Sequence, residues 1–296
     1  MSNTAKTTKT KPFLIILIVV LALLAIFGVI IHAIGFRYIR TDYTKYYGWV
    51  ENNIPVKGSI KYSDGIKGKL TANKDKTEFT ITYSTGDVYK GTLNGVARNG
   101  KGKITYSNGD IYEGDFVNDQ RTGKAIITLS RGDKYEGDVI NGLPDGVGLY
   151  TFADGSWYYG EFTQGKKNGA GEYHDADNNY YYGLFKDDLY HCTDINSIKL
   201  RDGSVYTGEA KLVFASGETY VGDFVDDART GIGTYTWPGG ESYTGSFLNG
   251  IIDGQGSYTF STGEVYTGIF ENGKVPQAEE NSEDNAKEGT DTLKEN

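Results

Sequence analysis

The stretch that decides the fold is Tyr243–Val265, which reads YTGSFLNGIIDGQGSYTFSTGEV. Counting its tyrosine as position 0, large apolar or aromatic residues stand at 0, +4, +15 and +17, and the residues at +1, +3, +14 and +16 are polar. Glycines stand at +2, +11 and +13. Alternation with a period of two is typical of a strand with one apolar face. The stretch therefore predicts two short strands and no helix.

The same 23-residue unit recurs along most of the chain. Its first tyrosine and the glycine at +2 are the residues that define the repeat structurally. These pairs are Tyr89 and Gly91, Tyr112 and Gly114, Tyr135 and Gly137, Tyr158 and Gly160, Tyr220 and Gly222, Tyr243 and Gly245, and Tyr266 and Gly268. Self-similarity at a fixed period indicates stacked units that share one continuous core. The sequence thus predicts an all-β fold, an elongated single-layer antiparallel β-sheet of stacked hairpins.

The alternation of large and small residues suggests how each hairpin packs. If +4 faces +13, the glycine at +2 faces the aromatic residue at +15, and the glycine at +13 faces the phenylalanine at +4. Each large side chain would then lie opposite a residue without one. Three-residue loops ending in glycine, as at Gly109 and Gly263, would join consecutive units, because glycine adopts a positive φ without steric cost.

These motifs resemble the MORN repeat family, whose unit is Tyr-x-Gly-x-Phe followed by Gly-x-Gly. With degenerate units included, the resemblance covers residues 58–275, and a break in phase near 186–210 predicts a kink, bulge or domain division. The resemblance implies membrane-associated assembly, protein–protein contact and, in some members, phospholipid binding. Because the Gly-x-Gly pairs precede strands and not helices, no dinucleotide cofactor is implied.

The N-terminal region contains a predicted transmembrane helix, placed at residues 13–36. Its apolar run of 22 residues, Phe13 to Ile34, would span roughly 33 Å. A cleavable signal peptide would have a shorter apolar run and a better cleavage site than Ala33-Ile34-Gly35. Basic residues flank both ends of the run, and the short basic tail 1–12 favours a cytoplasmic N-terminus with extracytoplasmic repeats.

Two further segments complete the expected organisation. Residues 37–57 are interpreted as a juxtamembrane linker whose tyrosines and tryptophan suit the membrane surface. Residues 276–296 are acidic and contain no aromatic residue, so they are predicted to be a disordered tail.

Composition and motifs predict no catalytic residue, no cofactor and no metal site. The net charge of −9 argues against a nucleic-acid partner, since phosphate binding needs a basic face. Cys192 is the single cysteine, and the pair His191-Cys192 has no second pair at ligand spacing. The carboxylates that recur at +3 are interpreted as the solvated side of an amphipathic sheet. They are Asp115, Asp138, Glu161 and Asp223.

The sequence therefore predicts a membrane-anchored, non-enzymatic interaction scaffold that presents its repeats to a protein partner. Lipid binding and self-association through open sheet ends are further hypotheses. A cell-surface carbohydrate- or wall-binding module is the alternative, since Gly/aromatic repeats also occur in such modules and Trp157-Tyr158-Tyr159-Gly160 resembles one. A phospholipid-modifying accessory protein ranks lower.

Overall fold

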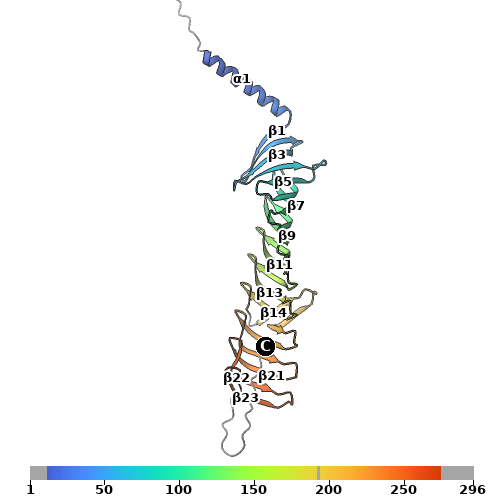
Figure 1. Cartoon of the computed structure of the whole chain (residues 1–296), viewed down its shortest axis with the longest axis vertical. Helices are drawn as coiled ribbons and strands as arrows, with labels where there is room; N and C mark the ends of the chain where they lie inside the picture. The colour runs from blue at the N-terminus through green and yellow to red at the C-terminus, as the bar shows by residue number, and fades with distance from the viewer. Residues whose placement is uncertain (1–11, 192–193, 275–296) are drawn as a thin grey trace, which may run out of the picture. The chain divides into compact units, whose positions relative to one another are not determined.

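The computed structural model describes residues 12–191 and 194–274. Over these residues the chain forms one helix and then 23 strands, and it divides into two compact units, Met1–Gln120 and Arg121–Asn296. Figure 1 shows the helix first and the strands following it in chain order. The predicted fold class, an antiparallel sheet of stacked hairpins after one apolar helix, is confirmed.

Helix α1 (Pro12–Ala33) is apolar except for His32 in its last turn. Over its span Ile16–Ala33 no side chain is buried by the rest of the protein, and among the described residues it is the one helix long and apolar enough to cross a membrane. It ends three residues before the predicted boundary at 36. Gly35 adopts a φ of +88°, and the first strand begins directly after it.

The first unit contains strands that each pair antiparallel with the next. They are β1 (Phe36–Arg40), β2 (Thr44–Glu51), β3 (Ile54–Tyr62), β4 (Lys67–Ala72), β5 (Phe79–Tyr83), β6 (Val88–Asn94), β7 (Ala97–Thr105) and β8 (Ile111–Val117). The interpretation of residues 37–57 as a linker is therefore wrong, because β1, β2 and the start of β3 occupy them. The physical reason is a degenerate repeat: Tyr46 is fully buried, and a Cβ added to Gly58 would lie 2.7 Å from its ring.

The second unit continues the same antiparallel pattern. Its strands are β9 (Gln120–Thr128), which begins one residue before the boundary, β10 (Lys134–Ile140), β11 (Leu143–Thr151), β12 (Trp157–Thr163), β13 (Lys166–His174), β14 (Tyr180–Lys186), β15 (Leu189–Tyr190), β16 (Asp194–Lys199), β17 (Val205–Glu209), β18 (Lys211–Val213), β19 (Thr219–Val225), β20 (Ala228–Thr236), β21 (Ser242–Leu248), β22 (Ile251–Thr259) and β23 (Val265–Phe270). β14 pairs with both β15 and β18, whereas β16 and β17 pair only with each other. The predicted phase break thus contains an inserted hairpin, after which the repeating sheet resumes.

The strand register differs from the one expected. In the unit that starts at Tyr220, this tyrosine faces Tyr235, and Gly222 faces Gly233. The expected pairing of +4 with +13 is therefore wrong. Large side chains still pack over glycines, but for a different reason. The tyrosine ring leans along its own strand and covers both glycines, so a Cβ on Gly233 would lie 2.5 Å from the Tyr220 ring.

The glycines at +2 show the same correction along the chain, because they face other glycines and not the aromatic residue at +15. Within one repeat, the facing pairs are Gly91 with Gly102, Gly137 with Gly148, Gly160 with Gly171, Gly222 with Gly233, and Gly245 with Gly256. Between neighbouring repeats, Gly114 faces Gly102, and Gly268 faces Gly256. Two facing glycines leave a gap above the sheet that can hold a whole ring, whereas one glycine opposite an aromatic residue would not.

The two glycines of Gly-x-Gly have different roles. Gly231, the first, has a φ of +59° and lies in the irregular stretch where the strand register shifts by two residues. Glycine is common at such bulges because it tolerates a positive φ. Gly233, the second, leaves room for the tyrosine ring. The expected three-residue loops are confirmed by a φ of +93° at Gly109 and +65° at Asn178.

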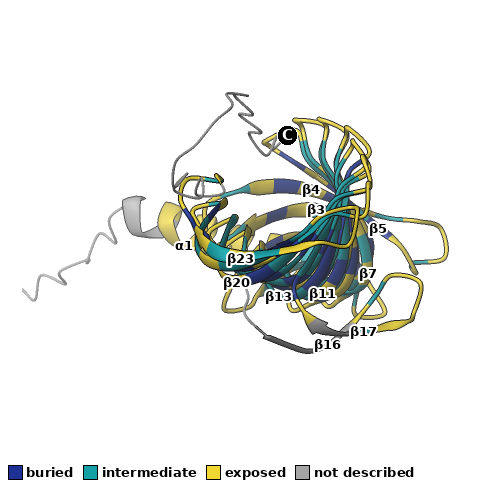
Figure 2. Ribbon diagram, turned by 90° about the horizontal axis from the view of Figure 1, so that it is seen from below, coloured by how far each residue is buried: buried dark blue, intermediate teal, exposed yellow. Residues whose placement is uncertain are grey.

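The core is a ladder of aromatic rings packed edge to face. Each phenylalanine at +4 lies between the tyrosine of its own repeat and the tyrosine of the preceding one. The ring centroids are 5.1 Å apart for Tyr158–Phe162, 4.7 Å for Tyr158–Phe185, 5.2 Å for Tyr181–Phe224 and 5.0 Å for Tyr220–Phe247. Such pairs add to the gain from apolar burial. Buried and exposed residues alternate along the strands (Figure 2).

Candidate functional site

A second row of aromatic residues lies on the same face as the buried tyrosines but stays half-buried. In the second unit it starts with Tyr150 and Phe152, whose ring centroids are 4.6 Å apart. It continues from Phe152 to Tyr173 at 6.4 Å and from Tyr173 to Tyr190 at 6.3 Å. Tyr150 and Tyr173 stand at +15 and face the tyrosines of the adjacent strands, Phe152 stands at +17, and Tyr190 stands at +9. The row therefore forms an open apolar surface over the core.

Tyr150 is held in place by an ion pair behind it. Its hydroxyl donates to Asp133 Oδ2 at 2.7 Å and accepts from Arg131 at 2.9 Å. Although burial raises the pKa of Asp133, hydrogen bonds from Tyr150, Arg131 and the Ala153 amide together keep that pKa below its usual value. The charged carboxylate thus fixes the orientation of the Tyr150 ring.

Lys167 on β13 extends across this aromatic surface. Its Nζ lies 4.9 Å from the ring centroid of Tyr173, 5.1 Å from Phe185 and 5.8 Å from Tyr158, distances at which cation–π attraction operates. Burial lowers the pKa of its ammonium group. Over residues 12–191 and 194–274, no carboxylate stands within ion-pair distance of this nitrogen. Asp188 accepts a hydrogen bond from the Lys167 amide, and not from its ammonium.

The corresponding cation of an earlier repeat is neutralised. Arg98, also at +9, donates from Nε to Asp119 Oδ1 at 2.9 Å and stacks over Tyr62, Tyr89 and Phe116. Lys167 keeps the aromatic neighbours of that arrangement, and Asp188 binds its main-chain amide as Asp119 binds that of Arg98, but Asp188 forms no ion pair with the Lys167 ammonium. Asp188 already takes the position that Asp119 takes beside Arg98, but the Lys167 ammonium could still pair with an acidic group of a ligand.

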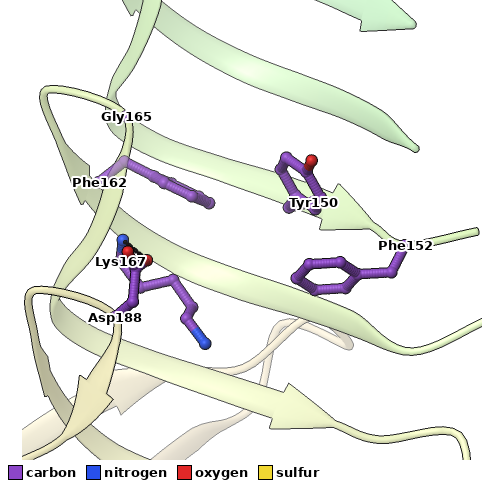
Figure 3. Close-up of a pocket in the computed structure, with 6 residues that line it drawn as sticks. All are labelled: Tyr150, Phe152, Phe162, Gly165, Lys167 and Asp188. Carbon is purple, nitrogen blue, oxygen red and sulfur yellow. Dashed lines mark hydrogen bonds between the residues drawn. The ribbon is translucent and has the colours of Figure 1, made fainter. Parts of the chain in front are cut away.

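Lys167 and the second aromatic row enclose a hollow of about 310 Å³. We call it the aromatic groove and define it by the residues that line it. They are Tyr150, Phe152, Phe162, Gly165, Lys167 and Asp188. Figure 3 shows Tyr150 and Phe152 on one side, Phe162 and the turn at Gly165 on the other, and the Lys167 side chain pointing into the space between them. The groove combines apolar walls with the Lys167 ammonium and the Asp188 carboxylate, and the ammonium, which has no ion pair within the described residues, suits a ligand carrying an apolar side chain beside an acidic group.

The tyrosines that define the repeat lie beneath this surface. Tyr89, Tyr112, Tyr135, Tyr158, Tyr220 and Tyr243 are at most 2% exposed, whereas Tyr266, in the last half repeat, is half-buried. Their hydroxyls donate to main-chain carbonyls three residues on, as in Tyr158 to Glu161 at 2.9 Å.

The defining glycines lie directly under these tyrosines. A Cβ added at +2 would lie 2.5 Å from the hydroxyl oxygen of the tyrosine of the same repeat at Gly91, Gly137, Gly160, Gly245 and Gly268. Gly114 occupies the same position on β8, where it faces Gly102. These glycines therefore serve the framework and contribute no group to the aromatic groove.

Sequence reasoning identified this framework and the aromatic positions +15 and +17, but it did not single out Lys167. The available signal was a lysine at +9, where three other repeats carry arginine.

The acidic row and the histidines provide no alternative site. Asp115 and Asp138 pair with Lys101 and Lys124, each at 2.7 Å. In the part of the chain that the structure describes, no three His, Cys, Asp or Glu residues gather as a metal site. Cys192 lies outside the described residues.

Comparison with known proteins identifies the repeat. The model of the MORN repeat matches residues 89–111, 112–134, 135–157, 158–180, 220–242 and 243–265. No curated protein matches the sequence.

Several solved structures are similar to the chain at a low level. The TCP10 domain of Danio rerio CPAP is 13% identical, with a TM-score of 0.37 over 72% of this chain and 97% of that one. The TCP domain of Drosophila melanogaster SAS-4, solved with a proline-rich motif of Ana2, is 15% identical, with a TM-score of 0.32 over 62% and 86%. An inactive virginiamycin B lyase from Staphylococcus aureus, solved with quinupristin, is 14% identical, with a TM-score of 0.17 over 79% and 83%. Likenesses this weak carry no functional argument.

Proposed function

Because the chain belongs to the MORN repeat family, we propose that it is a membrane-anchored scaffold that holds a partner protein in the aromatic groove. Repeat arrays of this kind act through the extended surfaces that they present. The observation that carries the proposal is the ammonium of Lys167, which lies among aromatic rings and, within the described residues, forms no ion pair, although Asp188 lines the same groove. A half-buried charge of this kind favours a ligand that neutralises it.

The anchor in this proposal is helix α1. Its length and composition fit the hydrocarbon thickness of a bilayer, and none of its side chains between Ile16 and Ala33 packs against the repeats. We propose that the short basic tail stays cytoplasmic and that the repeats lie outside. Protease treatment of intact cells should then digest the repeats. Protection of the repeats until the membrane is opened would place them in the cytoplasm.

The proposed occupant is a segment of a partner protein that carries an apolar or aromatic side chain next to an Asp or Glu. The apolar side chain would lie between Phe152 and Phe162, and the carboxylate would pair with Lys167. Forming this ion pair adds little desolvation free energy for the lysine, because its ammonium is already partly removed from water in the free protein. A charge-assisted contact at a site with little water stabilises binding by about 1.5–3 kcal/mol.

Photocrosslinking in intact cells tests the groove. A benzoylphenylalanine at Phe152 should crosslink a defined protein, while the same group at Tyr159, on the opposite face of the sheet, should not. Lys167→Met keeps the length of the side chain but removes its charge. It should weaken binding of the identified segment by about 10–100-fold. Lys166→Met is the matched control, because Lys166 is an exposed neighbour paired with Asp187.

Other outcomes contradict the proposal in distinct ways. Crosslinks from Tyr159 alone would move the binding surface to the opposite face. Binding of purified wall polysaccharide that Phe152→Ala abolishes would favour the carbohydrate-binding alternative.

We propose, further, that the chain catalyses no reaction. The tyrosine hydroxyls of the repeats donate to main-chain carbonyls and serve the fold. Purified full-length protein should show no turnover in a phosphatidylinositol kinase assay, and robust turnover would contradict this part of the proposal.

A further inference from the structure

The phase break of the repeats contains a hairpin that lies against the outward face of the sheet, the face opposite the aromatic groove. β15 and β18 both pair with β14 and form the two halves of one strand, because the His191 amide donates to the Leu184 carbonyl and Lys211 faces Tyr182. Residues 192–209 are therefore an insertion within a single strand. β16 lies against β13 and β14, but in the described residues β16 and β17 pair only with each other. Contacts that involve side chains, and not a shared strand ladder, must hold this hairpin to the sheet.

The part of the outward face beneath the hairpin carries three residues that the other complete repeats lack. Trp157 precedes the repeat tyrosine Tyr158, Glu172 stands at +14 and His174 stands at +16, and all three alternate with the inward-facing residues. The five other complete repeats all have threonine at +16. None of them has an acidic residue at +14 or an aromatic residue before its tyrosine. These departures from the repeat coincide with the insertion, so they point to a role in holding it.

Glu172 is the acceptor for the tip of the hairpin, residues 200–204. Although Glu172 stands on the outward face, it is only 6% exposed. One of its carboxylate oxygens accepts a hydrogen bond from the Arg201 amide at 2.9 Å, and the other accepts one from His174 Nε2 at 2.8 Å. Since an ionised carboxylate can only accept, a neutral His174 must carry its proton on Nε2. Both oxygens of this buried charge thus have a donor while the hairpin is docked.

Aromatic contacts hold the same tip. The Arg201 guanidinium lies 4.7 Å from the ring centroid of Trp157, a distance at which cation–π attraction operates. The Trp157 ring in turn stacks on His174, with the centroids 3.8 Å apart and the planes at 23°. Tyr206 of β17 packs on Tyr182 of β14 at 5.5 Å. His174 therefore belongs to the layer of side chains that the hairpin covers.

Titratable groups surround the Glu172–His174 pair on the elements that pack against it. Among the side chains that the structure describes, they are Tyr159 of β12, Asp175 after β13, Tyr180 and Tyr182 of β14, and Arg201, Asp202 and Tyr206 of the hairpin. Burial lowers the pKa of His174 and the Arg201 charge lowers it as well, whereas Glu172 and Asp175 act in the opposite direction; the net shift is downward. The docked hairpin therefore disfavours the protonated imidazole.

We propose that the hairpin β16–β17 covers the outward face reversibly and leaves it when His174 takes up a proton. Because the pKa of His174 is lower in the docked form, its contribution to docking is complete above the ordinary histidine pKa of about 6.5. This contribution is lost as the pH falls through the lower pKa of the docked form.

Undocking would expose Trp157 and Tyr182 and would free one oxygen of Glu172. The outward face would then be closed at neutral pH and would offer an aromatic surface beside a carboxylate in mildly acidic surroundings. This inference goes beyond the proposed function and does not depend on it, because the aromatic groove lies on the other face of the sheet.

Histidine titration by NMR tests the coupling, with the full-length chain in detergent micelles. The His174 signal is identified by its loss in His174→Thr. The comparison chain lacks residues 192–209 and joins His191 to Ala210, which keeps β15 and β18 in register opposite β14. We expect a higher pKa of His174 in this deletion variant than in the full chain, because the coupling between docking and protonation is reciprocal. Arg201→Ala removes the neighbouring cation and should shift that pKa in the same direction.

Hydrogen–deuterium exchange measures docking itself. After correction for the intrinsic exchange rate, the protection of residues 199–206 should fall several-fold between about pH 7.5 and about pH 5.5 in the full chain. His174→Thr restores the residue of the other repeats, and its protection should be the same at the two pH values. The loop Trp237–Glu241, closed by the hydrogen bond from the Gly240 amide to the Trp237 carbonyl, is the internal reference.

Three results would overturn the inference. The first is an equal pKa of His174 in the full chain and in the deletion variant. The second is a pH-dependent loss of protection that persists in His174→Thr, since another group would then cause it. The third is protection of the hairpin in the full chain that does not change with pH, or that is absent at both pH values. Near-ultraviolet circular dichroism checks that the deletion variant keeps the aromatic ladder, and Arg201→Ala supplies the titration if it does not.

Discussion

At the scale of single residues, the fold depends on tyrosine rings that lie over pairs of glycines. The Tyr220 ring covers Gly222 and Gly233, and its hydroxyl donates to the Asp223 carbonyl at 3.0 Å. The ring is fully buried although the sheet has a single layer. The glycine pair makes this burial possible, because any Cβ would occupy the space of the ring.

Adding one methyl group under a ring should therefore be costly. Gly233→Ala places a Cβ 2.5 Å from the Tyr220 ring, and we expect it to lower the free energy of unfolding by about 3 kcal/mol. Gly240→Ala is the control: its φ is +94°, but nothing lies within 4 Å of the added Cβ. It should cost only about 1–2 kcal/mol for backbone strain. Urea unfolding measures both, and equal losses would contradict the packing argument.

The buried hydroxyls also predict sensitivity to alkali. Burial raises the pKa of Tyr46 to about 12 and raises the pKa of Tyr158 and Tyr220 as well, from a usual value of 10.0. The folded state therefore keeps protons that the unfolded state releases. This contribution to stability is complete below pH 10 and is lost as the pH rises from there towards the folded pKa values.

Thermal unfolding measured as a function of pH checks this prediction. The melting temperature should fall steeply above about pH 10. Tyr158→Phe removes one of these groups and should make the fall shallower, at the cost of about 1 kcal/mol at neutral pH for the lost hydrogen bond. A melting temperature that stays constant up to about pH 12 would contradict the prediction.

At the scale of elements, the unit of construction is a hairpin with two different ends. The three-residue loop, as at Gly109, follows the second strand of a repeat, and a two-residue turn with positive φ at both residues, as at Asp226 and Asp227, lies within the repeat. From Asp119 onward, the second residue of each two-residue turn donates its amide to a carbonyl of the preceding repeat, as in Asp227 N to Tyr190 O. The inserted hairpin β16–β17 leaves the ladder unbroken, because Tyr181 still meets Phe224.

Whole repeats should therefore be removable in register. Deletion of the 23 residues 135–157 joins Lys134 to Tyr158 and should leave a cooperatively folded protein, because each repeat contacts mainly its neighbours. Deletion of the 22 residues 136–157 differs by one residue. It should unfold the adjoining repeats, since a shift by one reverses the face of every side chain. Circular dichroism and urea unfolding of the two deletions distinguish the cases, and equal stability would contradict the model of independent units.

At the scale of the whole molecule, the helix and the repeats have separate tasks. The aromatic ladder of the second unit does not involve α1. Removal of residues 1–35 should therefore move the protein from the membrane fraction to the soluble fraction and leave the near-ultraviolet circular dichroism of the aromatic core unchanged. Alkaline carbonate extraction of the full-length chain is the comparison, and release of the intact chain by carbonate would argue against a spanning helix.

The sequence by itself determined the helix, the strands and their grouping into hairpins. An apolar run of 22 residues without charge has few other structures open to it, and a period of two within a period of 23 specifies which side chains share a face. The glycines of the three-residue loops were also readable, because a positive φ imposes a strong local preference.

Only the tertiary structure decided which residues face each other across neighbouring strands. Sequence periodicity does not show the direction in which a tyrosine ring leans. The pairing of Gly222 with Gly233 depends on the bulge at Gly231, so it could be seen only in the structure. The strands within 37–57 were missed because Gly58 stands at +12 from Tyr46, one residue short of the regular spacing. The aromatic groove likewise depends on three-dimensional proximity: Lys167 gains its rings from β12, β13 and β14, and the side chains of separate strands meet only once the sheet has formed.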